Sequence, residues 1–193
     1  MVRFRLPQSL MEAGPARDLL FVSLGIVLFL LGADTLVERR PLAPRSFWAL
    51  FDVLVHGVVA LLIVFPIFGA PELAGRTTVL LYTILLTATM LDLDHFIAAG
   101  SLDLEGALQL ATRPATHSLT FSAVVGLLGL LLSGNALVGW GLFAAMASHV
   151  LRDAAAGFTP IVWPLSLSSI PWWAYYPGEV LLLLISFVVQ AKP

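Results

Sequence analysis

The four histidines of this chain each accompany aspartates, within or at the ends of long apolar segments. The histidines are His56, His95, His117 and His149, and the aspartates near them are Asp52, Asp92, Asp94 and Asp153. Ionisable side chains are costly within the hydrocarbon of a membrane, so they are rare there and usually have a function. Imidazole and carboxylate groups together are typical ligands of divalent metals. The pattern therefore predicts a metal site near a membrane surface.

Two of these pairs have a spacing of four residues, namely Asp52 with His56 and His149 with Asp153. Residues four apart share one face of a helix. Each pair could supply two metal ligands, or one ligand and the group that orients it. The alternative is a polar pair that meets water at the end of a helix.

The sequence Asp92-Leu93-Asp94-His95 places three potential ligands in four positions. Asp92 and His95 can share a helical face, whereas Asp94 points elsewhere unless the helix ends or unwinds here. Two carboxylates this close repel each other unless a cation or a proton offsets their charge. The alternative is a polar cap where a span meets water.

Two arginines lie near the candidate ligands. Arg113 precedes His117 by four residues, and Arg152 precedes Asp153. The guanidinium group suits bidentate contact with phosphate, although either arginine could instead anchor the protein to lipid headgroups. Thr116 or Ser118 could cap a helix that begins after His117.

The composition indicates an integral membrane protein. Of 193 residues, 59% are hydrophobic and 11% are charged, against about 45–50% and about 25% in soluble domains. Mean hydropathy is +0.96. There is no cysteine, so a metal would be held by nitrogen and oxygen, and the net charge of -2 gives no reason to expect nucleic acid binding.

We expect an all-α fold, a single integral membrane domain over residues 1–193 built as a polytopic bundle. A membrane-spanning helix needs about 20 apolar residues, and about six segments approach this length, five being possible. They are Leu19–Val37, Phe47–Phe68, Thr77–Ala98, His117–Leu132, Ala136–Leu151 and Pro177–Val189. Residues 1–18 would form a cytoplasmic or interfacial segment, and the aromatic stretch Phe158–Tyr176 would lie at the membrane–water boundary.

With six spans, every candidate ligand reaches the same side of the membrane, because odd-numbered loops share one side. The residues are Asp52 and His56 near the first loop, Asp92–His95 and His117 at the third, and His149 and Asp153 at the fifth. This agreement favours one shared site. Arginine and lysine are balanced between the two sides, so the positive-inside rule leaves the orientation open.

The motifs also have a characteristic order. They are His56, Leu91-Asp92-Leu93-Asp94-His95, Arg113-Pro114-Ala115-Thr116-His117-Ser118, His149-Val150-Leu151-Arg152-Asp153, and Gly157 with Trp163-Pro164-Leu165. This order resembles the YdjM-like family of membrane-bound metal-dependent hydrolases, sometimes described as LexA-regulated. The resemblance implies hydrolysis in a prokaryotic inner membrane.

The chain departs from that family pattern at three positions. Leu91 replaces a proline and Pro114 replaces a glycine. Thr112 stands where the family has a histidine, which would mean one ligand fewer, a changed metal or lost activity.

The residues suggest a hydrolase with one or two divalent metals, zinc or manganese first and iron or magnesium as alternatives. The expected metal ligands are His56, Asp92, Asp94, His95, His117, His149 and Asp153, and the expected catalytic residues are Arg113, Arg152 and Asp52. Metal-bound water would supply hydroxide near neutral pH. The arginines would hold the phosphate of a membrane lipid or a lipid-linked phosphoester.

Two alternatives stay open. Intramembrane histidines and aspartates also build pathways for metal ions or protons, and such a path needs polar residues across the whole membrane. The other alternative is a structural protein with a degenerate site, which would hold no metal tightly.

Overall fold

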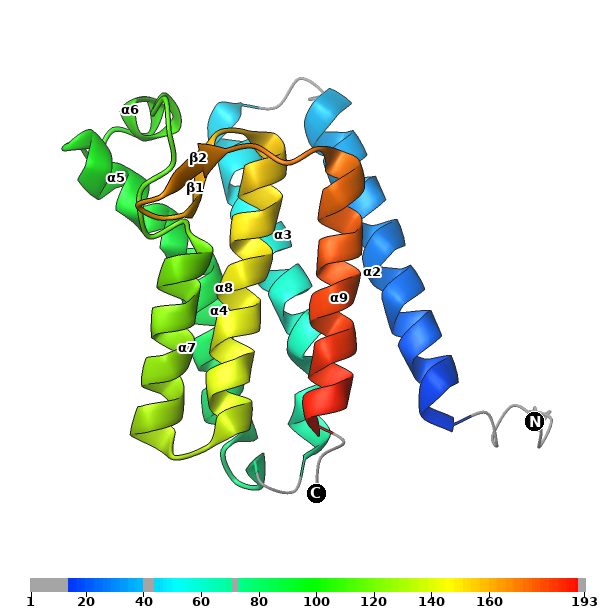
Figure 1. Ribbon diagram of the computed structural model, residues 1–193. Helices are drawn as coiled ribbons and strands as arrows, with labels where there is room; N and C mark the ends of the chain where they lie inside the picture. The colour runs from blue at the N-terminus through cyan, green and yellow to red at the C-terminus, as the bar shows by residue number, and fades with distance from the viewer. Residues whose placement is uncertain (1–13, 40–43, 71–72, 191–193) are drawn as a thin grey trace, which may run out of the picture.

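The computed structural model describes residues 14–39, 44–70 and 73–190, where long helices run side by side (Figure 1). These helices are α2 (Gly14–Arg39), α3 (Arg45–Val64), α4 (Thr77–Met90), α7 (Leu119–Ser133), α8 (Ala136–Ala156) and α9 (Trp172–Gln190). The expected all-α membrane helix bundle is confirmed. Of the segment 1–18, residues 1–13 lie outside the described residues, and α2 already begins at Gly14.

Within the described ranges, three helical stretches are long and apolar enough to cross a membrane. They are Arg45–Phe68, Thr77–Ala99 and Trp172–Gln190, and shorter apolar helices cover Phe21–Val37 and Leu119–Ser133. The last span was expected over about Pro177–Val189, and the structure extends it at its N-terminal end. The helix begins five residues earlier, at Trp172, and Pro177 lies inside it. Pro177 is the sixth residue of the helix, so it lies beyond the first turn and lacks one i→i−4 hydrogen bond, yet the helix continues through it.

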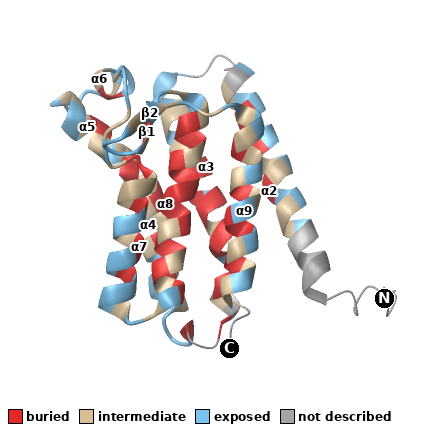
Figure 2. Ribbon diagram, viewed as in Figure 1, coloured by how far each residue is buried: buried red, intermediate tan, exposed pale blue. Residues whose placement is uncertain are grey.

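Helix α8 forms the centre of the bundle and is buried over most of its length (Figure 2). It contacts α3, α4, α7 and α9. Small residues allow the closest of these contacts, as is common between helices in membranes. A Cβ atom on Gly126 of α7 would lie 2.8 Å from the Cβ of Phe143 and 2.9 Å from the carbonyl oxygen of Gly139, both on α8.

The helix that begins as α4 changes geometry where the candidate ligands occur. A 3₁₀ segment, η3 (Leu91–Leu93), follows α4, and the short helix α5 (Asp94–Ala99) follows η3. The tighter winding of a 3₁₀ helix changes the direction of the side chains that follow. Helix α5 ends at Gly100, whose φ of +61° is the left-handed conformation typical of a glycine cap.

Shorter elements cover the same end of the bundle (Figure 1). They are helix α6 (Leu104–Leu108) and an antiparallel hairpin of β1 (Thr159–Val162) and β2 (Ser166–Ser168). The hairpin lies within the aromatic stretch expected at the membrane boundary, where no strand was expected. Helix α6 is also tied to α3, because Arg45 forms an ion pair with Glu105. Hydrogen bonds from Gln109 and Arg45 lower the pKa of the Glu105 carboxyl.

We predict that Gly126→Ala destabilises the bundle, because the added methyl group would push α7 away from α8. The expected loss is about 1–3 kcal/mol of unfolding free energy, as for other overpacked interiors. Thermal unfolding in detergent would measure it. Gly25→Ala is the matched control, because a Cβ at Gly25 meets no atom within 4 Å. Equal midpoints for the two variants would contradict the close α7–α8 contact.

Candidate metal centre

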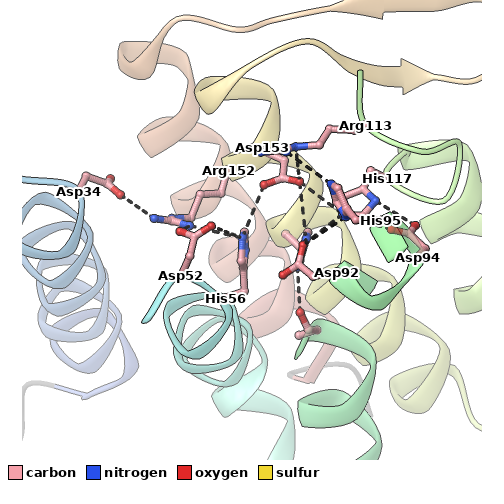
Figure 3. Close-up of polar contacts among 12 residues, drawn as sticks. Asp34, Asp52, His56, Asp92, Asp94, His95, Arg113, His117, Arg152 and Asp153 are labelled. Atoms are coloured by element: carbon pink, nitrogen blue, oxygen red, sulfur yellow. Dashed lines mark hydrogen bonds and ion pairs between the residues drawn. The ribbon is translucent and has the colours of Figure 1, made fainter. Parts of the chain in front are cut away.

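The expected site residues lie together at one end of the bundle (Figure 3). They come from four parts of the chain that are distant in sequence. These parts are α3 with Asp52 and His56, the η3–α5 junction with Asp92, Asp94 and His95, the segment before α7 with Arg113 and His117, and α8 with His149, Arg152 and Asp153. The arrangement of the helices therefore brings these side chains together.

Four of the candidate ligands converge most closely. The Nε2 atom of His117 lies 3.5 Å from Asp92 Oδ1 and 3.4 Å from Asp153 Oδ2. The Nε2 atom of His149 lies 3.4 Å and 3.8 Å from the same two oxygen atoms. Ligands at normal bond lengths around a tetrahedral zinc ion are about 3.3 Å apart. The spacing of these four groups therefore fits a metal ion between them.

The other ring nitrogen of each histidine orients this group. The Nδ1 atom of His149 lies 2.8 Å from the carbonyl oxygen of Ala88. A carbonyl oxygen only accepts, so Nδ1 carries the ring hydrogen and donates a hydrogen bond to it. The Nδ1 atom of His117 lies 3.2 Å from Asp94 Oδ2. Thr116 donates a hydrogen bond to the same carboxylate. Histidines that bind metals are typically oriented in this way, by an acceptor on the second nitrogen.

In the described part of the chain, neither Nε2 atom makes a hydrogen bond of good geometry, although each lies within ion-pair range of Asp92 and Asp153. The two histidine side chains are fully buried. Among the described residues, no hydrogen bond satisfies Nε2 of His117 or of His149. A buried polar atom without a partner is costly, and an ion between the four groups would satisfy both nitrogen atoms.

Local structure explains why these side chains converge. His149 and Asp153 are four residues apart on α8 and share a face. His117 immediately precedes Ser118, whose hydroxyl accepts a hydrogen bond from the Phe121 amide and caps α7. The η3 turn directs Asp92 toward α8 and lets Asp94 reach His117. Asp94 was expected to join the other ligands only if the helix ended or unwound here, and the 3₁₀ segment is such a change.

Arg152 is bound within the protein interior. Its guanidinium donates to Asp52 and, over 3.2 Å, to Asp34 Oδ1. Tyr176 donates to the other oxygen of Asp34, also over 3.2 Å. Arg152 is 5% exposed, so these carboxylates rather than a substrate neutralise its charge.

Sequence reasoning missed Asp34, which lies 118 residues before its partner Arg152. Asp34 was visible only as an acidic residue near the end of the first span. Nothing in its spacing connects it with the other motifs.

His56 lies between this arginine network and the four-ligand group. Its Nε2 atom is 3.6 Å from Asp153 Oδ1, 3.7 Å from Asp52 Oδ2 and 3.3 Å from Arg152 Nη1. Its ring stacks on His149 with centroids 3.7 Å apart. The three groups Asp52, His56 and Asp153 could hold a second ion, but the guanidinium already supplies positive charge there. Asp94, His95 and His117 form a further candidate group, toward which His117 directs Nδ1, whereas its Nε2 faces the four-ligand group.

Arg113 has a different environment from Arg152. Its Nε atom lies 3.0 Å from Asp153 Oδ2, and Nη1 lies 3.4 Å from His95 Nε2. The His95 Nδ1 atom is in turn 3.1 Å from Asp94 Oδ1. The Arg113 side chain is 27% exposed and lines a cavity. A guanidinium has five donors, so Arg113 retains capacity for an anion beside the four-ligand group.

A second residue missed from the sequence is Glu179. It is fully buried in α9, and its carboxyl faces Ser148 of α8 without a hydrogen bond of good geometry among the described residues. The hydroxyl of Tyr175, one turn earlier, is also buried without a partner among those residues. The signal was present, since Glu179 is the only charged residue between Trp172 and Gln190.

Comparison with known proteins corrects the family expectation. No family model matches the chain, and no solved structure matches it. The chain is 32% identical to Transmembrane protein 267 of Bos taurus over 168 residues, which cover 81% of this chain and 75% of that protein. It is 34% identical to the Danio rerio protein of the same name, over 69% of this chain and 63% of that protein.

The match to Transmembrane protein 267 of Xenopus laevis is 30% identity over 80% of this chain and 75% of that protein.

These relatives are vertebrate proteins, so the assignment to the YdjM-like family is wrong, and the expected location in a prokaryotic inner membrane has no support. The shared order of histidine and aspartate motifs was insufficient to identify the family. The apolar helices and the similarity along most of both chains agree that this is an integral membrane protein, and it belongs to the Transmembrane protein 267 family.

Proposed function

We propose that this protein is a membrane-embedded hydrolase that uses one divalent metal ion and acts on a lipid or lipid-linked phosphoester. Its metal ligands would be Asp92, His117, His149 and Asp153. The observation that carries the proposal is the convergence of two buried imidazole nitrogens and two carboxylates, with contacts of 3.4–3.8 Å. The Nε2 atoms of both histidines point to the same two carboxylates, as the ligands of a shared ion would.

The donor set fits several metals. Two nitrogen and two oxygen ligands suit zinc or manganese, with iron and magnesium as alternatives. Four protein ligands would complete a tetrahedral zinc site, whereas catalytic zinc sites usually keep a position open. A six-coordinate ion such as manganese would keep positions for water and substrate, which favours it for hydrolysis.

The remaining side chains have distinct roles in this proposal. A bound ion would lower the pKa of a coordinated water and supply hydroxide near neutral pH. Arg113, which is partly exposed beside the ligands, would hold the phosphate and stabilise the charge that develops on it. Asp94 and the Ala88 carbonyl would fix the two ligand histidines. Arg152 would act as a positioning residue that holds Asp52 and His56 beside Asp153.

We predict one equivalent of a transition metal in the detergent-purified protein. His117→Ala and Asp92→Ala should lose it, because each removes one of four ligands. Elemental mass spectrometry measures the content. His95→Gln is the matched control, since His95 lies in the same cluster but outside the four-ligand group, and it should retain the metal. No metal after reconstitution with zinc and manganese would support a degenerate site, and loss in His95→Gln would refute this ligand assignment.

We predict that Arg113→Gln lowers kcat/KM for a hydrolysed phospholipid by about 10²–10³-fold with metal content unchanged, as for loss of one transition-state donor. A panel of lipid monophosphates and diphosphates, assayed for released phosphate, supplies the measurement. Arg45→Gln is the control, because Arg45 is at the same end of the bundle but is exposed and paired with Glu105. Equal activities of the two variants would exclude Arg113 from phosphate binding.

Transport is the second candidate, and Glu179 is the observation that favours it. A fully buried carboxyl is unusual in a membrane helix and often belongs to a pathway for ions or protons. Further along α9, Ser186 accepts a hydrogen bond from the Trp140 indole at 2.9 Å, which extends the polar groups away from the metal centre. In proteoliposomes, transport predicts metal or proton flux that Glu179→Gln reduces. Hydrolysis without flux would exclude this candidate.

A further inference from the structure

A cavity of about 320 Å³ adjoins the candidate metal centre. It lies between α3, the α4–η3–α5 segment and α6, and most of its lining is apolar. The polar exceptions near the metal centre are Asp52, Asp92, His95, Arg113 and Asp153. Apolar pockets with a few polar groups that converge at one point are typical ligand sites, and this volume is at the lower end of their range.

The rim of the cavity faces outward from the bundle. Leu50 on α3 is 61% exposed, and Leu93 on η3 is 51% exposed. Both side chains line the cavity. The stretches that carry them, Arg45–Phe68 and Thr77–Ala99, are candidate membrane spans. Exposed leucines on a membrane span contact lipid, so the cavity opens sideways toward the hydrocarbon.

Helix α6 covers another side of the cavity. Ala107 is 2% exposed and contributes to the lining together with Leu104. The Arg45–Glu105 ion pair ties α6 to the start of α3, beside the cavity. A ligand that is apolar over most of its length would match these walls better than a water-soluble phosphoester would.

We propose that this cavity admits one hydrocarbon chain of a phosphorylated lipid sideways from the membrane, with the phosphate held by Arg113. This inference rests on the proposed hydrolase and specifies its substrate as a lipid phosphate. Among the described residues that line the cavity, Arg113 is the one guanidinium, and its ion pair with Asp153 places it between the apolar walls and the four-ligand group. The volume favours part of one chain rather than two.

The test uses a lysophosphatidate that carries a photoreactive diazirine on its chain, close to the glycerol. The protein is reconstituted in phosphatidylcholine nanodiscs, illuminated and mapped by peptide mass spectrometry. The proposal predicts labelling concentrated at Leu50 and Leu93. The double variant Leu50→Trp/Leu93→Trp should lose that labelling by about tenfold, because bulky side chains close the rim.

Leu54→Trp/Ile97→Trp is the matched control. Leu54 and Ile97 are 56% and 81% exposed, are near the rim residues in sequence and do not line the cavity. This variant should label like the wild type. Labelling spread evenly over the lipid-facing residues in every variant would overturn the proposal.

Two further labelling experiments test whether the phosphate headgroup is recognised. Arg113→Gln should reduce labelling by about tenfold, the value of one charge-assisted contact. A monoacylglycerol probe with the same chain and diazirine should label weakly and without dependence on Arg113. Equal labelling by the two probes would overturn phosphate recognition, and full competition by inorganic phosphate alone would assign Arg113 to a soluble anion instead.

The labelling does not require turnover, so it separates this inference from the proposed function. His117→Ala should abolish metal binding and hydrolysis but leave rim labelling in place, because His117 does not line the cavity. If the wild type holds no metal yet shows the predicted labelling, the hydrolase fails and the lipid cavity stands. If it holds metal and hydrolyses a phosphoester without rim labelling, the hydrolase stands and this inference fails.

Discussion

The convergence of buried imidazole and carboxylate groups at one end of the bundle is the constraint on which the rest of the structure depends. His117 and His149 are removed from water, and each uses Nδ1 for an acceptor and directs Nε2 to a shared point. Asp92 and Asp153 bring negative charge to that point. Such a group is unfavourable in an apolar surrounding unless a cation compensates it. Arg113 compensates part of this charge through its ion pair with Asp153, and the proposed divalent ion would compensate the rest.

The surrounding fold maintains this group from several directions. The central helix α8 contributes His149, Arg152 and Asp153, and its small residues let α7 pack closely against it. The winding change at η3 turns two aspartates toward the centre. Arg152 joins α8 to α3 and α2 through Asp52 and Asp34. Arg152 therefore connects helices within the bundle, whereas Arg113 is partly exposed beside the cavity.

The sequence predicted the helix bundle and the gathering of its histidines and aspartates. The lengths of the apolar segments indicate the helices, and the alternation of successive helices indicates which of their ends lie on the same side. The sequence predicted less about individual roles. Arg113 and Arg152 looked equivalent in sequence, and the structure distinguishes them by burial and by the pairing of Arg152 with Asp52 and Asp34. Glu179 carried a visible signal that was overlooked, whereas the strands of the β1–β2 hairpin are only four and three residues long, too short for a clear pattern. Motif order suggested the wrong family, because a metal-binding geometry constrains ligand spacing without specifying ancestry.

X-ray absorption spectroscopy of the metal-loaded, detergent-purified protein tests the central claim most directly. The account predicts a single metal environment with two imidazole nitrogens and carboxylate oxygens in the first shell, and loss of one imidazole in His117→Ala. An ion without imidazole scattering, or a spectrum unchanged by that substitution, would show that metal binds elsewhere and would contradict the assigned centre.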